Sequence, residues 1–459
     1  MTLLITYFNC EHACLKFSCG LNYLLTTCNG LCIIHLFFFI SLFPLNALAQ
    51  NNGTVAVGSI ITASEISSPW LSPSQDFAFG FQPLRDKDLF LLSIWYNKIP
   101  EKTVVWYVNT IDPVPRGSKI ELNSDFGLVL SDPQNQTIWN TEWILPDRVD
   151  HGFLNDTGNF ILIGGSDNRR LWESFKLPAD TLLPLQELEY GIDLISRLSE
   201  TNFLRGRFYV RFQRDGNLVL TTKSVPTNVD DDAVYYQTKI SDPLNSGYRI
   251  ILNSDGAISL LKTNNQEEVI LGSLSTSLPT SENYLRATID FDGVFTLYYH
   301  PKISTANSKW SALWSVPDNI CLSITGDKGS GACGFNSICN ITNQRPNCEC
   351  PEGYTLLDPN NKYGSCIPNF TPSCAKVEQL ELYDLLVLKD IDWPLSDYEQ
   401  IYPSNESVCR QACLQDCFCA VAIFRSNSCW KKKLPLSNGR VDTTLNAKAF
   451  IKYRKSAAP

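Results

Sequence analysis

The stretch QRDGNLVLT, which begins at Gln213, places polar side chains at alternate positions. Alternate side chains of a β-strand lie on one face of the sheet. The residues that would share this face are Gln213, Asp215, Asn217, Val219 and Thr221. Leu218 and Leu220 would point the other way, into a core. A row of amide and carboxylate groups is either a solvated face or a binding face for a ligand that is rich in hydroxyl groups.

A repeat that contains this stretch predicts the elements that position it. An Asp, a small or turn residue and then alternating apolar residues recur around Asp125, Asp156, Asp215, Asp255 and Asp292. Asp-Gly or Asp-x-Gly closes a turn, and the run after it is typical of a half-buried strand. Repeated hairpins of this kind pack into prism-like or barrel-like β-domains. The length of the span indicates two such domains, which meet near residues 177–184.

Length and composition set the broad class. The 459-residue chain is long enough for three or four domains. Short apolar runs such as DFAFGF, LFLLSIWY and VFTLYYH predict strands, and no long stretch of helical period competes with them. The formal net charge is −9, and the basic run at Lys431–Lys433 is short. A nucleic-acid-binding footprint is therefore excluded.

The N-terminal segment is typical of an exported protein. A short apolar run at Leu31–Leu45 precedes small residues at Ala47 and Ala49, which indicates a signal peptide over residues 1–49 with cleavage before Gln50. The run is too short for an ordinary membrane span, although an uncleaved anchor remains the alternative.

Cysteines and sequons agree with export. Five of the 17 cysteines lie in the leader, and the other 12 follow residue 320 in two groups of six. The first group is Cys321, Cys333, Cys339, Cys348, Cys350 and Cys366, and the second is Cys374, Cys409, Cys413, Cys417, Cys419 and Cys429. Even numbers in compact clusters indicate disulfides in an oxidising compartment rather than thiolate metal sites. The predicted N-glycosylation sites are Asn52, Asn135, Asn155, Asn340, Asn369 and Asn405.

Several segments resemble a known family. QRDGNLVLT resembles the sugar-binding repeat Q-x-D-x-N-x-V-x-Y of bulb-type lectins and departs from it only where Thr221 replaces Tyr. SPSQDFAFGF, LLSIWYNKIPEKTVVWYVN and LWESFKLPADTLLP resemble the plant G-type lectin S-receptor-like kinases and the S-locus glycoproteins. The resemblance implies that Gln213, Asp215 and Asn217 hydrogen-bond sugar hydroxyls. It also implies that Val219 contacts the apolar face of a mannose-type ring, while Thr221 keeps a hydroxyl at the last position.

The motif has a second interpretation, as a folding device. Asp-Gly turns and alternating strands need these residue types even where no ligand binds. The other repeats depart further from the sugar-binding pattern: Asn123 and Gly127 replace Gln and Asn around Asp125, and Leu154 replaces Gln near Asp156.

The resemblance also implies an order of domains in a mainly β chain. The order is a signal peptide (1–49), a bulb-type lectin β-prism domain (50–176), a second lectin-like β-prism domain (177–304), an EGF-like module (317–367) and a PAN/apple module (374–453).

Six cysteines allow 15 pairings, so the residues alone do not fix the disulfides. The resemblance implies the pairs Cys321–Cys339, Cys333–Cys348, Cys350–Cys366, Cys409–Cys429, Cys413–Cys419 and Cys374–Cys417. The run ESVCRQACLQ predicts a short helix capped by Ser404 or Asn405. It would place Cys409 and Cys413 on one face.

Catalysis has little support in the sequence. Beyond the leader only His151 and His300 remain, and neither lies in a nucleophile motif. A DFG tripeptide at Asp125–Gly127 belongs to the β-repeat, and the Gly-rich loop, strand Lys and HRD that a kinase needs are not found with it. We expect no catalytic residue, no cofactor and no metal.

The sequence thus predicts a secreted or surface-displayed recognition protein of the apoplast. It would bind glycan or protein ligands, as a lectin receptor-like kinase ectodomain without its kinase, with no partner nucleic acid and no membrane span beyond the leader. Its EGF-like and PAN modules would mediate homodimerisation or contact with a receptor kinase. One alternative is a truncated gene model of a membrane receptor serine/threonine kinase, displayed at the cell surface. A less favoured alternative is a secreted hydrolase.

Overall fold

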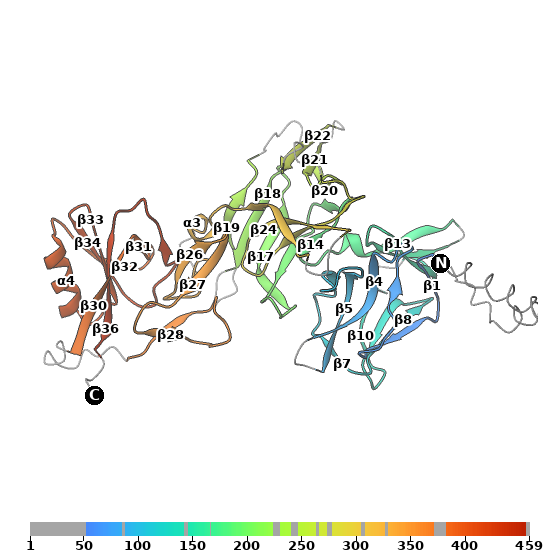
Figure 1. Ribbon diagram of the computed structural model, residues 1–459, viewed down its shortest axis with the longest axis horizontal. Helices are drawn as coiled ribbons and strands as arrows, with labels where there is room; N and C mark the ends of the chain where they lie inside the picture. Colours follow the sequence, from blue (N-terminus) through green and yellow to red (C-terminus); the bar gives the residue numbers. More distant parts are fainter. Residues whose placement is uncertain are drawn as a thin grey trace, which may run out of the picture. The chain divides into compact units, whose positions relative to one another are not determined.

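The structure is a computed structural model dominated by β-strands (Figure 1), which confirms the predicted mainly β class. It describes residues 52–455 except 85–87, 142–145, 166, 224–229, 240–246, 263–265, 273–277, 304–307, 326–328 and 371–381. The predicted signal peptide, residues 1–49, lies outside the described residues. In the part of the chain that is described, no helix has both the length and the apolar character needed to cross a membrane.

Three antiparallel sheets form the first β-region. The first sheet has the order β1 (Thr54–Ala56), β11 (Val149–Leu154), β12 (Phe160–Gly164), β13 (Arg169–Glu173). The second has the order β10 (Thr137–Asn140), β9 (Gly127–Ser131), β8 (Lys119–Asn123), β2 (Ile60–Thr62). The third has the order β3 (Trp70–Leu71), β4 (Phe77–Pro83), β5 (Leu89–Tyr96), β6 (Val104–Tyr107), with β7 (Val114–Pro115) on β5. All three contribute to one buried core, and a 3-10 turn, η2 (Ser174–Lys176), follows β13.

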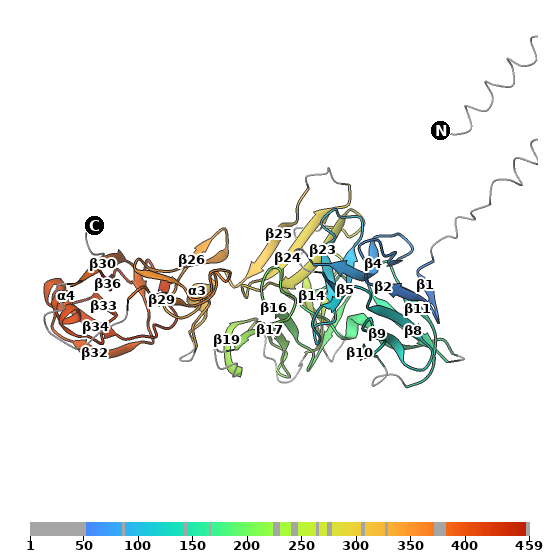
Figure 2. The same ribbon diagram turned by 90° about the horizontal axis from the view of Figure 1, so that it is seen from below.

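Three further antiparallel sheets form the second β-region, again around one core. The first has the order β14 (Thr181–Leu182), β23 (Asn283–Ile289), β24 (Phe295–Pro301), β25 (Ser311–Val316). The second has the order β15 (Glu187–Glu189), β20 (Gly247–Leu252), β21 (Ile258–Lys262), β22 (Glu267–Leu271). The third has the order β16 (Leu194–Arg197), β17 (Arg205–Phe212), β18 (Leu218–Lys223), β19 (Asp230–Gln237). Figure 2 shows β23, β24 and β25 side by side, so this region continues past residue 304 to the end of β25.

The turns of the repeat are closed in a common way. The Gln213 N–H donates to the Asn217 carbonyl at 2.9 Å, and the Gly216 N–H donates to the Gln213 carbonyl at 3.0 Å. Equivalent bond pairs close the turns that begin at Asn155, Asn253 and Asp290. The glycine of each turn has a positive φ, which glycine adopts without steric cost: Gly158 (+88°), Gly216 (+89°), Gly256 (+88°) and Gly293 (+86°). The repeat seen in the sequence is therefore a repeat of hairpin turns.

Where the cysteine-rich C-terminal region is described, it contains three sheets and two α-helices. A four-stranded sheet has the order β27 (Arg345–Glu349), β26 (Ile338–Thr342), β35 (Arg440–Val441), β31 (Ile391–Asp392). A two-stranded sheet joins β28 (Tyr354–Leu356) and β29 (Cys366–Pro368). A five-stranded sheet has the order β30 (Tyr383–Lys389), β36 (Lys448–Arg454), β33 (Val421–Arg425), β34 (Ser428–Lys432), β32 (Asp397–Ile401). The helices are α3 (Ile320–Ser323) and α4 (Glu406–Gln415).

The helix α4 spans the run ESVCRQACLQ, for which the sequence predicts a helix. Its N-cap is Asn405, whose side chain accepts a hydrogen bond from the Val408 N–H at 3.0 Å. Cys409 and Cys413 are both fully buried on its inner face, which confirms the expected spacing.

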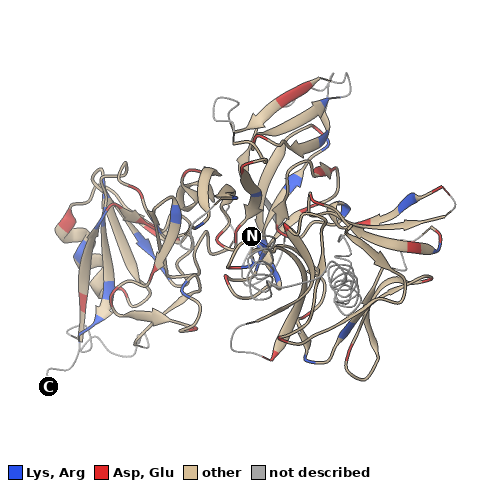
Figure 3. Cartoon of the chain, turned by 45° about the vertical axis from the view of Figure 1, so that its right-hand side comes forward, with Lys and Arg blue, Asp and Glu red and all other residues tan. Residues whose placement is uncertain are grey.

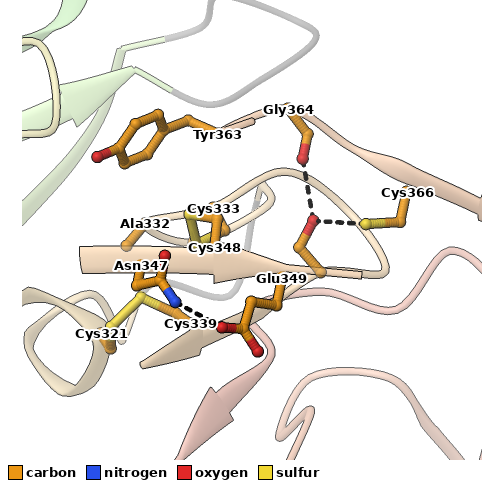
Figure 4. Close-up of a disulfide and its surroundings, with 12 residues drawn as sticks. Cys321, Ala332, Cys333, Cys339, Asn347, Cys348, Glu349, Tyr363, Gly364 and Cys366 are labelled. Carbon is orange, nitrogen blue, oxygen red and sulfur yellow. Dashed lines mark hydrogen bonds between the residues drawn. A yellow bond between two sulfur atoms is a disulfide. The ribbon is translucent and has the colours of Figure 1, made fainter. Parts of the chain in front are cut away.

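Among the described residues five complete disulfides cross-link the C-terminal region, and they are pairs that the resemblance implies. They are Cys321–Cys339, Cys333–Cys348, Cys350–Cys366, Cys409–Cys429 and Cys413–Cys419. Figure 4 shows two of them beside the hairpin of β26 and β27. Cys417 is also disulfide-bonded, whereas its expected partner Cys374 lies outside the described residues.

The ranges assigned to the EGF-like and PAN modules are packed together in this structure. The strand β26 pairs with β35 from the other range, and Ile338 shares a core with Ile391 and Val421. The indole of Trp393, which is fully buried, donates to the Ser337 carbonyl at 3.1 Å. The two ranges therefore share a core and a sheet.

Two arginines connect the C-terminal region to the second β-region. Arg207 on β17 donates to the carbonyls of Gly331 and Ala332 at 2.9 and 2.5 Å. In the opposite direction, Arg345 on β27 reaches Asp290 at 2.7 Å and Asp292 at 3.0 Å. The two regions are thus joined through two half-buried arginine side chains.

Candidate functional site

The Gln213–Thr221 motif divides into a turn and a strand. Strand alternation alone would place Gln213 to Thr221 on one face, whereas Asp-Gly predicts a turn. The structure has the turn, from Gln213 to Asn217 between β17 and β18, and the strand begins at Leu218. The expectation for the apolar side chains is confirmed, because Leu218 and Leu220 lie in the core of the second β-region. The turn arises because Asp-Gly favours tight reversal over an extended strand.

The polar half of the motif is largely engaged with itself. The Asn217 backbone N–H donates to Asp215 Oδ1 at 3.0 Å, and the Asn217 side-chain amide donates to Asp215 Oδ2 at 2.8 Å. Thr238 Oγ1 donates to Asn217 Oδ1 at 3.4 Å. Asn217 is buried, while Gln213 and Asp215 are exposed. Of these three side chains, only those of Gln213 and Asp215 can be reached by a ligand from solvent.

The strand half of the motif is covered by neighbouring side chains. Val219 is 0% exposed and Thr221 is 3% exposed. Their cross-strand partners are Arg211 and Tyr209, and the Arg211 guanidinium lies 4.7 Å from the centre of the Tyr209 ring. Arg211 Nε also contacts Asp193 Oδ2 at 3.1 Å, which holds the cover in place.

The same carboxylate position recurs with a turn-closing role. Asp255 and Asp292 each accept a bond from the backbone N–H two residues on, at 3.0 and 3.1 Å, as Asp215 does. In the turn that begins at Asn155 this place belongs to Thr157, and the Asn155 side chain accepts from its N–H at 3.0 Å. These contacts are those of a folding device.

The structure contains an open groove that the sequence did not indicate. We call it the Trp139 groove; it has a volume of about 320 Å³. Its walls include Trp106, Tyr107 and Trp139 of the first β-region, and Ile192, Asp193 and Ile195 of the second. A second hollow of about 600 Å³ adjoins it and shares Asn109, Thr110 and Arg205 with it. These residues come from four separate segments, so no local motif could reveal them.

The two histidines have ordinary structural environments. His300 is 1% exposed, and its ring nitrogens lie 2.9 and 3.3 Å from the carbonyls of Pro301 and Ser308. His151 Nδ1 lies 2.8 Å from Asp150 Oδ2, its neighbour in sequence. Within the described ranges, no three Cys, His, Asp or Glu side chains gather as a metal site requires.

The predicted glycosylation sites differ little in exposure. Five of the six asparagines are exposed, namely Asn52, Asn135, Asn340, Asn369 and Asn405. Asn155 is half-buried, because its Oδ1 accepts three bonds within its own turn. In Figure 3 the Lys and Arg positions and the Asp and Glu positions are both scattered over the sheets.

Comparison with known proteins assigns the class. Residues 103–201, which run from the start of β6 past β16, match the family described as D-mannose binding lectin. The chain is therefore a bulb-type lectin-domain protein.

The relatives extend this assignment over most of the sequence. The chain is 39% identical, over 92% of its length, to the G-type lectin S-receptor-like serine/threonine-protein kinase RLK1 of Arabidopsis thaliana. It is also 39% identical, over 89% of its length, to LECRK2 of Oryza sativa subsp. indica, of the same description. It belongs with the G-type lectin S-receptor-like proteins, as its motifs suggest. The alignments cover 53% and 52% of those two relatives, so the chain spans about half of their length.

Solved structures add little. A two-domain lectin from Scilla campanulata aligns with 58% of this chain and 100% of its own, at 17% identity and a TM-score of 0.21. A Marasmius oreades lectin aligns with 30% of this chain and 90% of its own, at 18% identity and a TM-score of 0.20. Both scores are too low to support an argument about this chain.

Proposed function

We propose that the chain recognises mannose-type glycans outside the cell, as the ligand-binding part of a lectin receptor. The observation that carries the proposal is the lectin-family match of residues 103–201. This span supplies most of the lining of the Trp139 groove. The disulfides support an extracellular setting, because such bonds persist in oxidising compartments.

At the Gln213 hairpin we propose that sugar contact is limited to Gln213 and Asp215. The remaining motif residues are buried or covered. Mannose hydroxyls could donate to the exposed carboxylate and pair with the amide. The apolar platform for the ring would come from elsewhere on the chain.

A glycan array with the purified, secreted chain tests this function. We expect retention of mannose-type glycans, weakened in the Gln213→Ala and Asp215→Ala variants. Asp255→Ala is the matched control, because it removes the equivalent turn bond in a sister hairpin. Array binding that is absent in the folded wild-type chain would refute glycan recognition. Equal binding by the Asp215 and Asp255 variants would leave the motif with a folding role only.

We propose a binding role rather than a catalytic one. The two described histidines are engaged with neighbouring groups. Sequencing the transcript beyond the codon for Pro459 decides whether the natural product continues into an apolar span and a kinase. Turnover of any glycan by the purified chain would contradict the binding role.

A second proposed function is contact with a protein partner through the C-terminal region, including a second copy of the chain or a receptor kinase. Three apolar side chains near α4 support it, since Tyr402, Val408 and Phe418 are 73%, 46% and 69% exposed. Light scattering on the purified chain tests homodimerisation. We expect a dimer that Phe418→Ser weakens, and a monomer at all concentrations would contradict the homodimer.

A further inference from the structure

The Trp139 groove and the hollow beside it form one continuous recess. The two spaces have volumes of about 320 and 600 Å³ and share Asn109, Thr110 and Arg205 as lining residues. Both volumes fall in the range of small-molecule sites in proteins. A recess with two lobes has room for a ligand with more than one ring.

The recess has an apolar wall suited to a pyranose ring. Trp139 is half-buried and packs partly against the core, so part of its indole faces the groove. Leu177 lines the same groove with 41% of its surface exposed, and Ile138 lines the second hollow with 38% exposed. The C–H face of a sugar packs on such surfaces, because an aromatic ring offers a large, rigid apolar contact.

Polar groups converge where the two lobes meet. Arg205 Nη2 donates to Asn109 Oδ1 at 3.3 Å, which orients both side chains. Arg205 is exposed and has no carboxylate within ion-pair distance among the described residues. Its remaining N–H groups and the Asn109 amide can therefore bond hydroxyl groups of a ligand.

The charges of the recess favour a neutral ligand. Asp193 is paired with Arg211, so the charged side chains that remain are Arg205, which lines both lobes, and the exposed Asp112, which lines the larger hollow. Among the lining residues, one positive charge is thus balanced by one negative charge. An acidic sugar would gain at Arg205 and lose at Asp112.

The recess also continues the sheet face that carries the Gln213 motif. Ile195, in the groove wall, is the cross-strand partner of Tyr209, which in turn pairs with Thr221. Asp193, also in the wall, pairs with Arg211, which is the cross-strand partner of Val219. Val219 and Thr221 are therefore buried within the chain itself, and this side of the sheet is open at the groove.

We propose that the Trp139 groove, with the adjoining hollow, binds a neutral oligosaccharide of at least two rings. Trp139 supplies the stacking surface, and Asn109 with Arg205 supplies the hydrogen bonds at the junction. This inference rests on the proposed glycan recognition and names the place where the sugar is held.

The test is calorimetric titration of the full chain with an α-linked mannose trisaccharide and with trigalacturonate. We expect Arg205→Ala and Trp139→Ala each to weaken trisaccharide binding about tenfold or more. Tyr248→Ala is the control, since it removes an aromatic side chain that is 42% exposed on β20, away from the recess. Thermal melts identify any variant that is misfolded, and Arg205, being exposed, gives a variant that should fold.

The outcomes separate this proposal from the proposed function. Trisaccharide binding that Arg205→Ala and Trp139→Ala leave unchanged, while array binding persists, overturns the groove and leaves glycan recognition standing. An absence of trisaccharide binding, or tighter binding of trigalacturonate, overturns the neutral oligosaccharide as ligand. Loss of all array binding refutes the proposed function itself.

Discussion

At the scale of single residues, Thr221 occupies the last position of the sugar-binding pattern but is buried in the strand. Its hydroxyl is buried with no hydrogen-bond partner among the described residues, on the strand position opposite Tyr209. A buried hydroxyl that lacks a partner costs about 1–3 kcal/mol. The position therefore keeps a polar group that the covered strand does not use.

We predict that Thr221→Val stabilises the chain by about 1 kcal/mol, because the valine keeps the shape and removes the unsatisfied hydroxyl. Urea unfolding of the disulfide-intact protein measures the change. Thr222→Val on the same strand is the control, since that hydroxyl donates to the Lys223 carbonyl at 3.2 Å. A loss of stability in Thr221→Val would show that the hydroxyl has a partner.

The sequence predicts residue roles only where they depend on local pattern. The inward direction of Leu218 and Leu220 follows from strand alternation and is confirmed. The surroundings of Val219 depend on Arg211 and on its ion-pair partner Asp193. Asp193 lies in a different segment, directly before β16. Alternation cannot reveal which distant side chain folds over a face.

At the scale of elements, the basic run at Lys431–Lys433 is an internal brace rather than a surface patch. Lys432 is 1% exposed on β34, where its Nζ contacts the Trp393 carbonyl at 2.8 Å and Asp392 at 3.2 Å. Lys431 lies 2.6 Å from Asp416, beside α4. Lys431 and Lys432 thus connect β34 to β31 (Ile391–Asp392) and to the C-terminal end of α4.

Removing the buried lysine should be far more damaging than removing its exposed neighbour. We predict that Lys432→Ala costs about 3–5 kcal/mol, because it leaves the buried Asp392 carboxylate without its cation. Lys433→Ala, one residue on and exposed, should change stability by less than about 0.5 kcal/mol. Chemical denaturation of both variants is the measurement, and equal losses would contradict the brace.

The bounds of single helices and strands could be predicted better than the elements with which they pair. The helix at Glu406–Gln415 and the strand at Leu89–Tyr96 have the bounds that their sequence runs indicate. In the run QRDGNLVLT the Asp-Gly turn and the strand after it are as predicted, but Gln213, Asp215 and Asn217 lie in the turn rather than on a strand face, where Gly216 has a positive φ. Alternation alone could not locate that break.

At the scale of the whole molecule, one Asp of the β-repeat also binds the C-terminal region to the second β-region. Asp292 closes its turn and accepts from Arg345 of the C-terminal region at 3.0 and 3.2 Å. Burial raises the pKa of Asp292 to about 6, the nearby Asp290 acts in the same direction, and Arg345 opposes both. The charged form of Asp292 is therefore disfavoured by folding.

The sign of the resulting pH dependence follows from proton binding. Between the unfolded pKa near 3.8 and the folded pKa of about 6, the folded chain holds more protons at Asp292 than the unfolded chain. We predict that this residue lowers the free energy of unfolding by roughly 2 kcal/mol as the pH rises through that window.

The measurement is the difference in unfolding free energy between wild type and Asp292→Asn at pH 4 to 7. Asp255→Asn is the matched control, because Asp255 has the same turn position without an arginine partner among the described residues. A pH profile that Asp292→Asn leaves unchanged would contradict the raised pKa.

The sequence suggests the order of the regions along the chain, but it does not predict the contacts by which the regions pack together. The family resemblance implies the disulfide pairs, and the structure confirms five of them, each between cysteines at most 20 positions apart. The sheet that β26 shares with β35 joins residues about 100 positions apart, and Arg345 reaches Asp290 across 55 positions. The Trp139 groove likewise exists only after the two β-regions pack together, so no single segment predicts it.

The central claim is that the two β-regions recognise saccharide, and hydrogen exchange with added glycan tests it most directly. Amide exchange of the full chain is followed by mass spectrometry with and without the α-linked mannose trisaccharide. We predict slower exchange in segments 104–115, 137–140 and 191–205, which line the recess. Protection confined to residues 317–455, or no protection by a ligand at saturating concentration, would contradict the account.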